Sequence, residues 1–202
     1  MGPYHCRSEA TKQPMSSMKT IDKNITIQGK RINLRRIRKP DARSIYQYAR
    51  EWDIAKYTFI PHPYELEDAN IFIKDVHSMI RRNSGLVLGI ENPKTKQVIG
   101  TIGSHNINWR HRRAEIGYWL GKKYWGNGYA SEAVMLFLRY LFETLELNRV
   151  FALVMDANEK SGEMLARLGF TCEGRQRQVC LQYKERYDYL YYGILRDEFR
   201  KL

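Results

Sequence analysis

A glycine-bearing turn between an apparent strand and an apparent helix is the segment of this sequence best suited to chemistry. Residues 115–120 alternate as a β-strand does, and a run of helix-forming residues begins at Ser131. Gly126 and Gly128 lie between them, and without a Cβ they let the backbone turn and approach a ligand closely. Unpaired N–H groups converge where the helix dipole is positive. The segment therefore predicts an anion site, and a diphosphate fits it.

The spacing excludes several other sites. A dinucleotide-binding Gly-x-Gly-x-x-Gly turn needs a third glycine where Ser131 stands, and a Walker-type loop needs Gly-Lys-Ser/Thr after its glycines. Cys6, Cys172 and Cys180 form no CxxC pair, and the histidines show no ligand spacing. We therefore expect no metal site, no disulfide framework and reduced thiols.

The glycine turn resembles the acyl-CoA turn of the GNAT acetyltransferases, which reads Arg/Gln-x-x-Gly-x-Gly/Ala. This chain has Trp125-Gly126-Asn127-Gly128-Tyr129-Ala130 and departs at the first position, where Trp125 replaces Arg or Gln. The longer pattern Tyr-Trp-Gly-x-Gly-Tyr-Ala-x-Glu-Ala is similar to the RimJ/RimL-type branch, which acetylates ribosomal protein N-termini. Segments 158–161, 165–170 and 186–195 resemble the same branch, so the likeness spans nearly the whole chain.

The resemblance implies an α/β GNAT fold, in which a mixed seven-stranded central sheet is flanked by about four helices. Strands four and five are splayed in this fold to hold acyl-CoA. The residue pattern predicts one strand or a strand pair at 25–37 and strands at 86–90, 97–107, 112–120, 149–155, 170–181 and 183–195. It predicts helices at 40–51, 65–82, 127–145 and 160–168. Such an order indicates a sheet with both parallel and antiparallel neighbours.

The same resemblance implies the cofactor contacts. Backbone N–H groups of the turn hold the CoA diphosphate, and a strand N–H near Leu120 holds the thioester carbonyl. The expected cofactor-binding residues are Leu120, Trp125, Gly126, Asn127, Gly128, Tyr129, Ala130, Ser131 and Asn158. An amine would attack the carbonyl directly, which requires a base, an oxyanion donor and an acid for the thiolate.

Three residues are the catalytic candidates. Glu115 lies in the strand that faces the thioester and could take the amine proton directly or through water; the alternative is a surface glutamate paired with Arg112 or Arg113. Many members of the family carry a tyrosine acid in the fourth helix, where this chain has a leucine. The resemblance instead implies Ser161 as the acid, with Asn158 bonded to pantetheine or water. The position of Asn158 also suits a helix N-cap.

Composition indicates one domain. The chain has 202 residues, of which 43% are hydrophobic, enough for one substantial core. Residues 1–22 are polar and non-periodic, so we expect a flexible N-terminal tail followed by a GNAT N-acetyltransferase domain over 23–202. No apolar run approaches the length of a membrane span, and no signal peptide is evident; we expect a cytoplasmic protein.

The net charge favours acidic partners. The formal charge is +12 and the sequence pI is about 9.6. We expect Arg112, Arg113, Lys122 and Lys123 close to the CoA phosphates. Further basic pairs elsewhere exceed what one cofactor needs and would suit an acidic or ribosome-bound protein substrate. A polycation such as spermidine would be repelled.

Two classes of function follow. The favoured one is an N-acetyltransferase that moves acetyl from acetyl-CoA to the N-terminal α-amine of a protein, ribosomal proteins included; within that class the alternative acceptor is a small amine, polyamine or antibiotic. The other class is a non-catalytic, basic ribosome- or nucleic-acid-binding module. No RNP1 or KH motif supports direct RNA recognition. Monomer and homodimer both remain open.

Overall fold

Two five-stranded sheets form the centre of the molecule. The computed structural model describes residues 19–201. The first sheet has the order β1-β2-β3-β4-β7, and the second has the order β5-β6-β8-β10-β9. The strands are β1 (Thr26–Gln28), β2 (Asn33–Arg36), β3 (Leu86–Glu91), β4 (Val98–Ser104), β5 (Ile107–Asn108), β6 (Arg113–Glu115), β7 (Gly117–Leu120), β8 (Arg149–Met155), β9 (Thr171–Gln182) and β10 (Glu185–Leu195). All pairs are antiparallel except β6 with β8.

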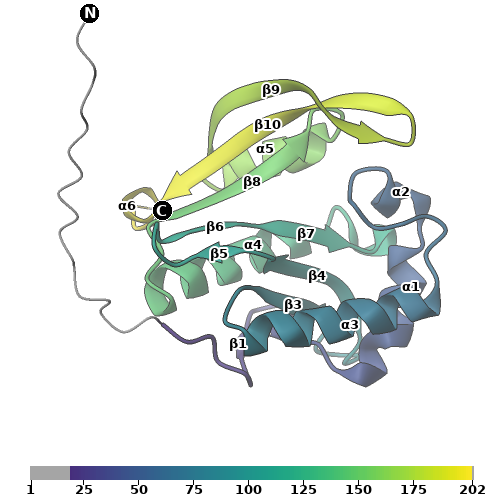
Figure 1. Cartoon of the computed structure of the whole chain (residues 1–202). Coiled ribbons are helices and arrows are strands. Elements are labelled where there is room, and N and C mark those ends of the chain that lie inside the picture. Colours follow the sequence, from purple (N-terminus) through teal and green to yellow (C-terminus); the bar gives the residue numbers. More distant parts are fainter. Residues whose placement is uncertain (1–18, 202) are drawn as a thin grey trace, which may run out of the picture.

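Helices cover both faces of the first sheet. They are α1 (Ala42–Ala49), α2 (Trp52–Ala55), α3 (Leu66–Arg81), α4 (Tyr129–Arg139), α5 (Glu159–Arg167) and α6 (Arg196–Phe199), with short turns η1 (Lys39–Asp41), η2 (Lys122–Tyr124) and the π-helical η3 (Tyr140–Thr144). Figure 1 shows α1 and α3 in front of the sheet and α4 behind it. Every residue of β3 and β4 is buried, because both faces of these strands are covered. No helix in the described range 19–201 is long and apolar enough to cross a membrane.

The strand expected at 112–120 divides between the two sheets. Glu115 of β6 pairs with Phe151 of β8, and the Ile116 N–H donates to the Phe151 carbonyl over 2.8 Å. One residue later, Gly117 of β7 pairs with Gly103 of β4 instead. The chain therefore leaves the second sheet for the first at Ile116, and β7 and β8 diverge beyond that point (Figure 1).

The GNAT fold predicted from the sequence is confirmed, and so is the divergence of the fourth and fifth expected strands. The central sheet differs in detail, since it forms two halves with ten strands in place of seven. The extra strands arise because 25–37 forms a strand pair, one of the two possibilities expected there, and because 97–107 and 112–120, expected as single strands, each divide in two. The short helix α6 was not predicted from the sequence.

The described residues begin at Lys19, ahead of the expected start of the domain at residue 23. Residues 1–18 of the expected tail fall outside the described residues. Ile21, also in that segment, is 1% exposed and packs into the core, and its N–H donates to the Asn83 side chain over 2.9 Å. The last residues of the expected tail therefore belong to the fold.

A buried ionic cluster joins the first sheet to the start of α1. Arg35 of β2 donates two hydrogen bonds to Asp41, of 2.8 and 2.9 Å, and its Nε donates to Glu91 of β3. All three residues are buried. Hydrogen bonding to Asp41 raises the pKa of Arg35 above its ordinary value, so the guanidinium stays charged.

Candidate active site

The turn before α4 presents a row of unpaired N–H groups. Gly126 and Gly128 both have positive φ, of 76° and 72°, which glycine adopts without the strain that other residues incur. Within the described range, the N–H groups of residues 126–131 donate no hydrogen bond. Trp125, Gly126, Asn127 and Gly128 are exposed, whereas Tyr129, Ala130 and Ser131 are partly buried. The predicted turn thus has the backbone geometry of an anion site at a helix start.

Two side chains of the turn hold its shape rather than face a ligand. The Trp125 indole N–H donates to the Leu120 carbonyl. The Asn127 amide donates to the carbonyls of Trp125, over 2.9 Å, and Tyr124. At the position where the family pattern has Arg or Gln, Trp125 therefore holds the turn to the end of β7 through its bond to the Leu120 carbonyl.

The Leu120 N–H points away from β4. The Gly121 N–H donates to the Ile99 carbonyl over 2.9 Å, and hydrogen-bonded pairs alternate along an antiparallel ladder. Trp119 and Gly117 therefore bond to β4, while Tyr118 and Leu120 direct their N–H groups to the open edge of β7. That edge is the side from which β8 diverges, as expected for a donor to a thioester carbonyl.

Glu115 lies at the end of β6, where the two sheets part. Its side chain is solvent-accessible, and partial burial of the carboxylate raises its pKa above the ordinary value. No Lys, Arg or His in the described range lies within salt-bridge distance of it. The expected alternative, a surface pair with Arg112 or Arg113, does not form. The carboxylate also contributes to the raised pKa of Tyr189, after burial and the Cys180 thiol.

Ser161 is hydrogen-bonded to a residue that sequence reasoning missed. The Ser161 and Tyr118 hydroxyl groups lie 2.7 Å apart, which links α5 to β7. Burial raises the pKa of Tyr118 to about 12, although the Ser161 bond lowers it. The residue position that holds the family tyrosine is Leu165 here, and Leu165 is fully buried in the core. A phenol is therefore present near Ser161, but it comes from the strand instead of the helix.

Asn158 occupies the N-cap position of α5 without capping it. Its carbonyl accepts the Ser161 N–H over 3.0 Å, but its side-chain amide makes no cap hydrogen bond. The amide is partly buried. Its donors and acceptor are available to a ligand, as the cofactor-binding expectation requires.

The structure does not bring together at the turn the four basic residues that were expected close to the CoA phosphates. The Arg112 guanidinium bonds to the Glu146 carbonyl over 2.8 Å. Arg112 precedes β6 and Arg113 begins it, so both lie roughly 20 Å of extended chain away from the turn. Lys122 forms an ion pair with Asp53. Only Lys123 stays next to the turn without a carboxylate partner, and its Nζ lies 4.9 Å from the Tyr48 ring centroid.

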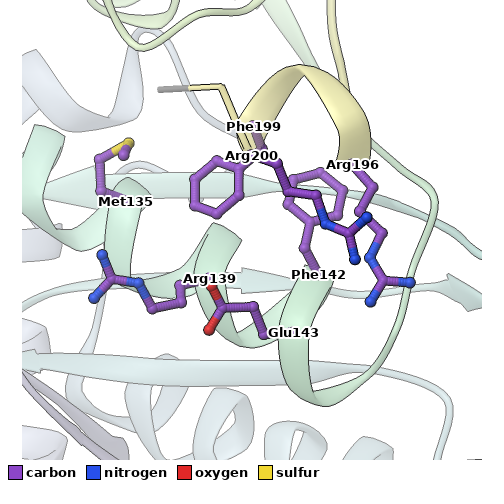
Figure 2. A pocket seen from close by; sticks show the side chains of 7 residues that line it. All are labelled: Met135, Arg139, Phe142, Glu143, Arg196, Phe199 and Arg200. Carbon is purple, nitrogen blue, oxygen red and sulfur yellow. The ribbon is translucent and has the colours of Figure 1, made fainter.

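Two surface hollows lie outside the region where β7 and β8 part. One, of about 340 Å³, is at the far end of α4 from Gly128, and Figure 2 shows its lining side chains, namely Met135, Arg139, Phe142, Glu143, Arg196, Phe199 and Arg200. The other, of about 360 Å³, adjoins Asn158 and is lined by Asp156, Glu159 and Glu163, whose charge disfavours an anion. The described range holds no cluster of metal-ligating side chains.

The candidate groups lie on two faces of one strand segment. Successive side chains of a strand alternate, so Glu115 shares a face with Gly117 and Trp119, whereas Tyr118 is on the opposite face with Ser161. The N–H of Leu120 lies at the edge between the faces. A carboxylate and a hydroxyl pair on opposite sides of a reacting carbonyl suit acyl transfer from a thioester to an amine.

The model of the acetyltransferase (GNAT) domain family matches residues 31–171. The chain belongs to the GNAT acetyltransferases. It is an N-acetyltransferase of this family, with acetyl-CoA as cosubstrate.

The similar proteins include acetyltransferases whose names give different acceptors. The N-acetyltransferase YoaA of Bacillus subtilis is 36% identical over 82% of this chain and 94% of its own length. The [ribosomal protein uS5]-alanine N-acetyltransferase of Escherichia coli is 31% identical over 52% of this chain and 55% of its own. The spermidine N(1)-acetyltransferase of Escherichia coli is 30% identical over 71% and 74%.

Solved GNAT structures have the same fold. A GNAT-family acetyltransferase from Bacillus anthracis superposes with a TM-score of 0.75 at 26% identity, covering 86% of this chain and 99% of the other. The microcin C7 self-immunity acetyltransferase MccE, solved with acetyl-CoA and AMP, has a TM-score of 0.75 at 22% identity over 83% and 93%.

Proposed function

We propose that this acetyltransferase acts on the N-terminal α-amine of a protein, with Glu115 as base and Ser161 as acid. The observation that carries the two catalytic roles is the placement of the carboxylate and the Tyr118–Ser161 pair on opposite faces of the same strand segment; the acceptor rests on the comparison and charge arguments below. The diphosphate of acetyl-CoA binds the free N–H groups of residues 126–131.

The reaction proceeds by direct attack. The neutral amine forms a bond to the thioester carbon, and the carbonyl oxygen becomes an oxyanion that the Leu120 N–H stabilises. The amine proton passes to Glu115. Because Glu115 is three residues, or roughly 10 Å, from Tyr118 along the strand, this transfer uses a water between amine and carboxylate.

Collapse of the intermediate breaks the carbon–sulfur bond. Ser161 donates its proton to the departing thiolate, and Tyr118 returns a proton to Ser161 through their hydrogen bond. Glu115 then releases the amine proton to solvent, and Tyr118 takes a proton from solvent, which restores both groups. Tyr118 is protonated at neutral pH, since its pKa is raised to about 12. Asn158 holds the pantetheine amide with its side-chain amide, which makes no cap hydrogen bond to α5.

Two observations support a protein acceptor. The uS5-alanine acetyltransferase is among the relatives. The formal charge of +12 would attract an acidic partner and repel a polyamine. A small amine is the second candidate, because the spermidine acetyltransferase matches a larger share of this chain than the uS5 enzyme does.

Mass spectrometry of a ribosomal protein extract, incubated with the enzyme and isotope-labelled acetyl-CoA, tests the proposal. Label on one or a few protein N-termini is expected, and a Glu115→Gln enzyme should give much less of it. Parallel incubations with spermidine and a set of small amines complete the test. Label that enters only the small amines would overturn the protein acceptor and leave the acetyltransferase chemistry intact.

A further inference from the structure

Arg31, in the turn between β1 and β2, reaches the start of α4 about a hundred residues further along the chain. Its backbone N–H donates to Glu132 Oε1 over 2.9 Å, and its Nε donates to Glu132 Oε2 over 2.8 Å. Its two terminal nitrogens donate to the carbonyls of Asn127, over 2.7 Å, and Gly128, over 3.2 Å. One arginine therefore contacts the glycine turn and the first helical turn together.

These contacts decide which way the turn presents its N–H groups. In a planar trans peptide the C=O and the N–H point in opposite directions. Since Arg31 holds the carbonyls of Asn127 and Gly128, the N–H groups of the same peptides, on Gly128 and Tyr129, face away from Arg31. Both N–H groups belong to the unpaired row at residues 126–131. Arg31 thus lies behind the turn, opposite the face on which an anion would bind.

The second consequence is electrostatic. Glu132 lies in the first turn of α4, where its carboxylate would repel a diphosphate bound at the helix start. Its side chain is only 13% exposed. Burial raises the pKa of Glu132, but bonds from the Arg31 backbone and side chain and from the Lys30 N–H outweigh burial and lower it. The carboxylate is ionised, and Arg31 supplies the matching charge.

Gly29 allows the β1–β2 turn to lie close to the start of α4. A Cβ on Gly29 would lie 2.6 Å from Glu132 Oε1 and 2.7 Å from a Leu136 methyl group, so only glycine allows the turn to come this close. The Arg31 guanidinium also lies 5.6 Å from the centre of the Tyr129 ring.

We propose that Arg31 is a positioning residue of the acetyl-CoA site, which orients the diphosphate turn and neutralises Glu132. The inference rests on the proposed binding of the diphosphate at residues 126–131. Arg31 does not touch the cofactor itself; it acts through the backbone of the turn and through the carboxylate behind it.

Arg31→Met removes the charge and the hydrogen bonds but keeps the aliphatic stem. We expect calorimetry to give a Kd for acetyl-CoA about tenfold or more above that of the native protein, with kcat at saturating acetyl-CoA nearly unchanged. S-acetylpantetheine lacks the diphosphate, so kcat/KM for it should not change. Arg31→Lys keeps the charge without the planar guanidinium, so its Kd for acetyl-CoA should lie between those of the native protein and Arg31→Met. Arg36→Met is the matched control, since Arg36 holds the Lys23 carbonyl away from the turn.

Pairing Arg31→Met with Glu132→Gln isolates the electrostatic part. Removing the unpaired carboxylate should restore part of the acetyl-CoA affinity, and the deficit of Arg31→Met alone should shrink as salt rises. Native-like affinity of a folded Arg31→Met protein would overturn the inference, as would an equal loss with S-acetylpantetheine. If Gly128→Val also left affinity unchanged, the proposed cofactor turn itself would fail; a loss in Gly128→Val alone would reject only Arg31.

Discussion

The hydroxyl groups of Tyr118 and Ser161 lie 2.7 Å apart and connect β7 of the first sheet to α5, which packs on the second. The bond therefore spans the place where the two sheets diverge. Burial keeps Tyr118 protonated, because its pKa is raised to about 12. A serine whose oxygen is bonded to a neutral phenol can give up its own proton and be reprotonated in the same event. In the proposed mechanism the pair supplies the proton that the departing thiolate requires.

Replacing either hydroxyl should slow the chemical step without weakening cofactor binding. For Ser161→Ala we expect a fall in kcat of about 10²- to 10⁴-fold, the usual range for loss of a general acid, and for Tyr118→Phe a smaller fall. The double variant should lose little more than Ser161→Ala alone, because both residues serve one proton transfer. Initial rates at saturating substrates measure this. Tyr192→Phe is the control, since Tyr192 packs against Gly162 of α5 and makes no described hydrogen bond. Strictly additive losses would contradict a shared proton path.

Glu115→Gln should lower turnover and change its pH dependence. Partial burial raises the pKa of Glu115 above its ordinary value, and only the ionised carboxylate accepts a proton. The kcat of the native enzyme should therefore decline as pH falls through that raised pKa, and the variant should lack this limb while binding acetyl-CoA normally. An unaltered pH–rate profile would show that another group takes the proton. Glu185→Gln, an exposed change on β10, is the control.

Glu115→Gln should also change the stability of the fold. A raised pKa means that the folded state binds the Glu115 proton more tightly than the unfolded state does. The resulting stabilisation is present below the unfolded pKa and is lost as pH rises through the folded pKa. At neutral pH the ionised carboxylate therefore destabilises the fold, and Glu115→Gln should leave the Tm equal to or above that of the native protein. A lower Tm in thermal unfolding at pH 7 would contradict the assigned cause of the shift.

The part of the site that depends on neighbouring residues could be predicted from the sequence. Gly126 and Gly128 lie directly between a strand and a helix, so their role follows from adjacent residues. The change of sheet at Ile116 could not be predicted from local pattern. Uninterrupted alternation over 112–120 is the same whether the segment forms one strand or two strands in different sheets. Tyr118 was missed because its partner, Ser161, is 43 residues away in the sequence. Alternation placed Tyr118 on the face opposite Glu115, and only the fold brings α5 to it.

Gly128→Val should remove most of the affinity for acetyl-CoA. The native φ of 72° is one that a β-branched residue adopts only at a cost of about 1–2 kcal/mol, and a Cβ there would lie 3.1 Å from the Arg31 guanidinium. Relief of that strain would turn the N–H groups of the turn away from the diphosphate. Calorimetry with acetyl-CoA is the measurement. Gly174→Val is the control, because nothing lies within 4 Å of a Cβ at that exposed strand position. Native-like affinity in a folded Gly128→Val protein would remove the turn from the cofactor site.

Arg35→Met should destabilise the whole fold while leaving the cofactor site intact. It would leave Asp41 and Glu91 as buried carboxylates without their cation, and breaking a buried ion pair in this way typically costs about 3–5 kcal/mol. Denaturant unfolding should show that loss in the free energy of unfolding. Arg200→Met removes only an exposed contact with Asp197 and serves as the control. If both substitutions lowered the free energy of unfolding equally, the buried ion pairs of Arg35 would stabilise the fold no more than the exposed contact of Arg200 does.

The acceptor can be tested through its charge. If the substrate is an acidic or ribosome-associated protein, the formal charge of +12 should accelerate encounter, and salt screens that attraction over about 8 to 10 Å at physiological ionic strength. We expect kcat/KM for an intact protein acceptor to fall clearly as salt rises from low to several-fold physiological. Spermidine should be acetylated poorly at every salt concentration, because like charge disfavours its approach. Acetyl-CoA must stay saturating throughout, since salt also weakens binding of this anion. Efficient spermidine turnover together with inactivity on protein N-termini would reject the protein acceptor and favour the small-amine alternative.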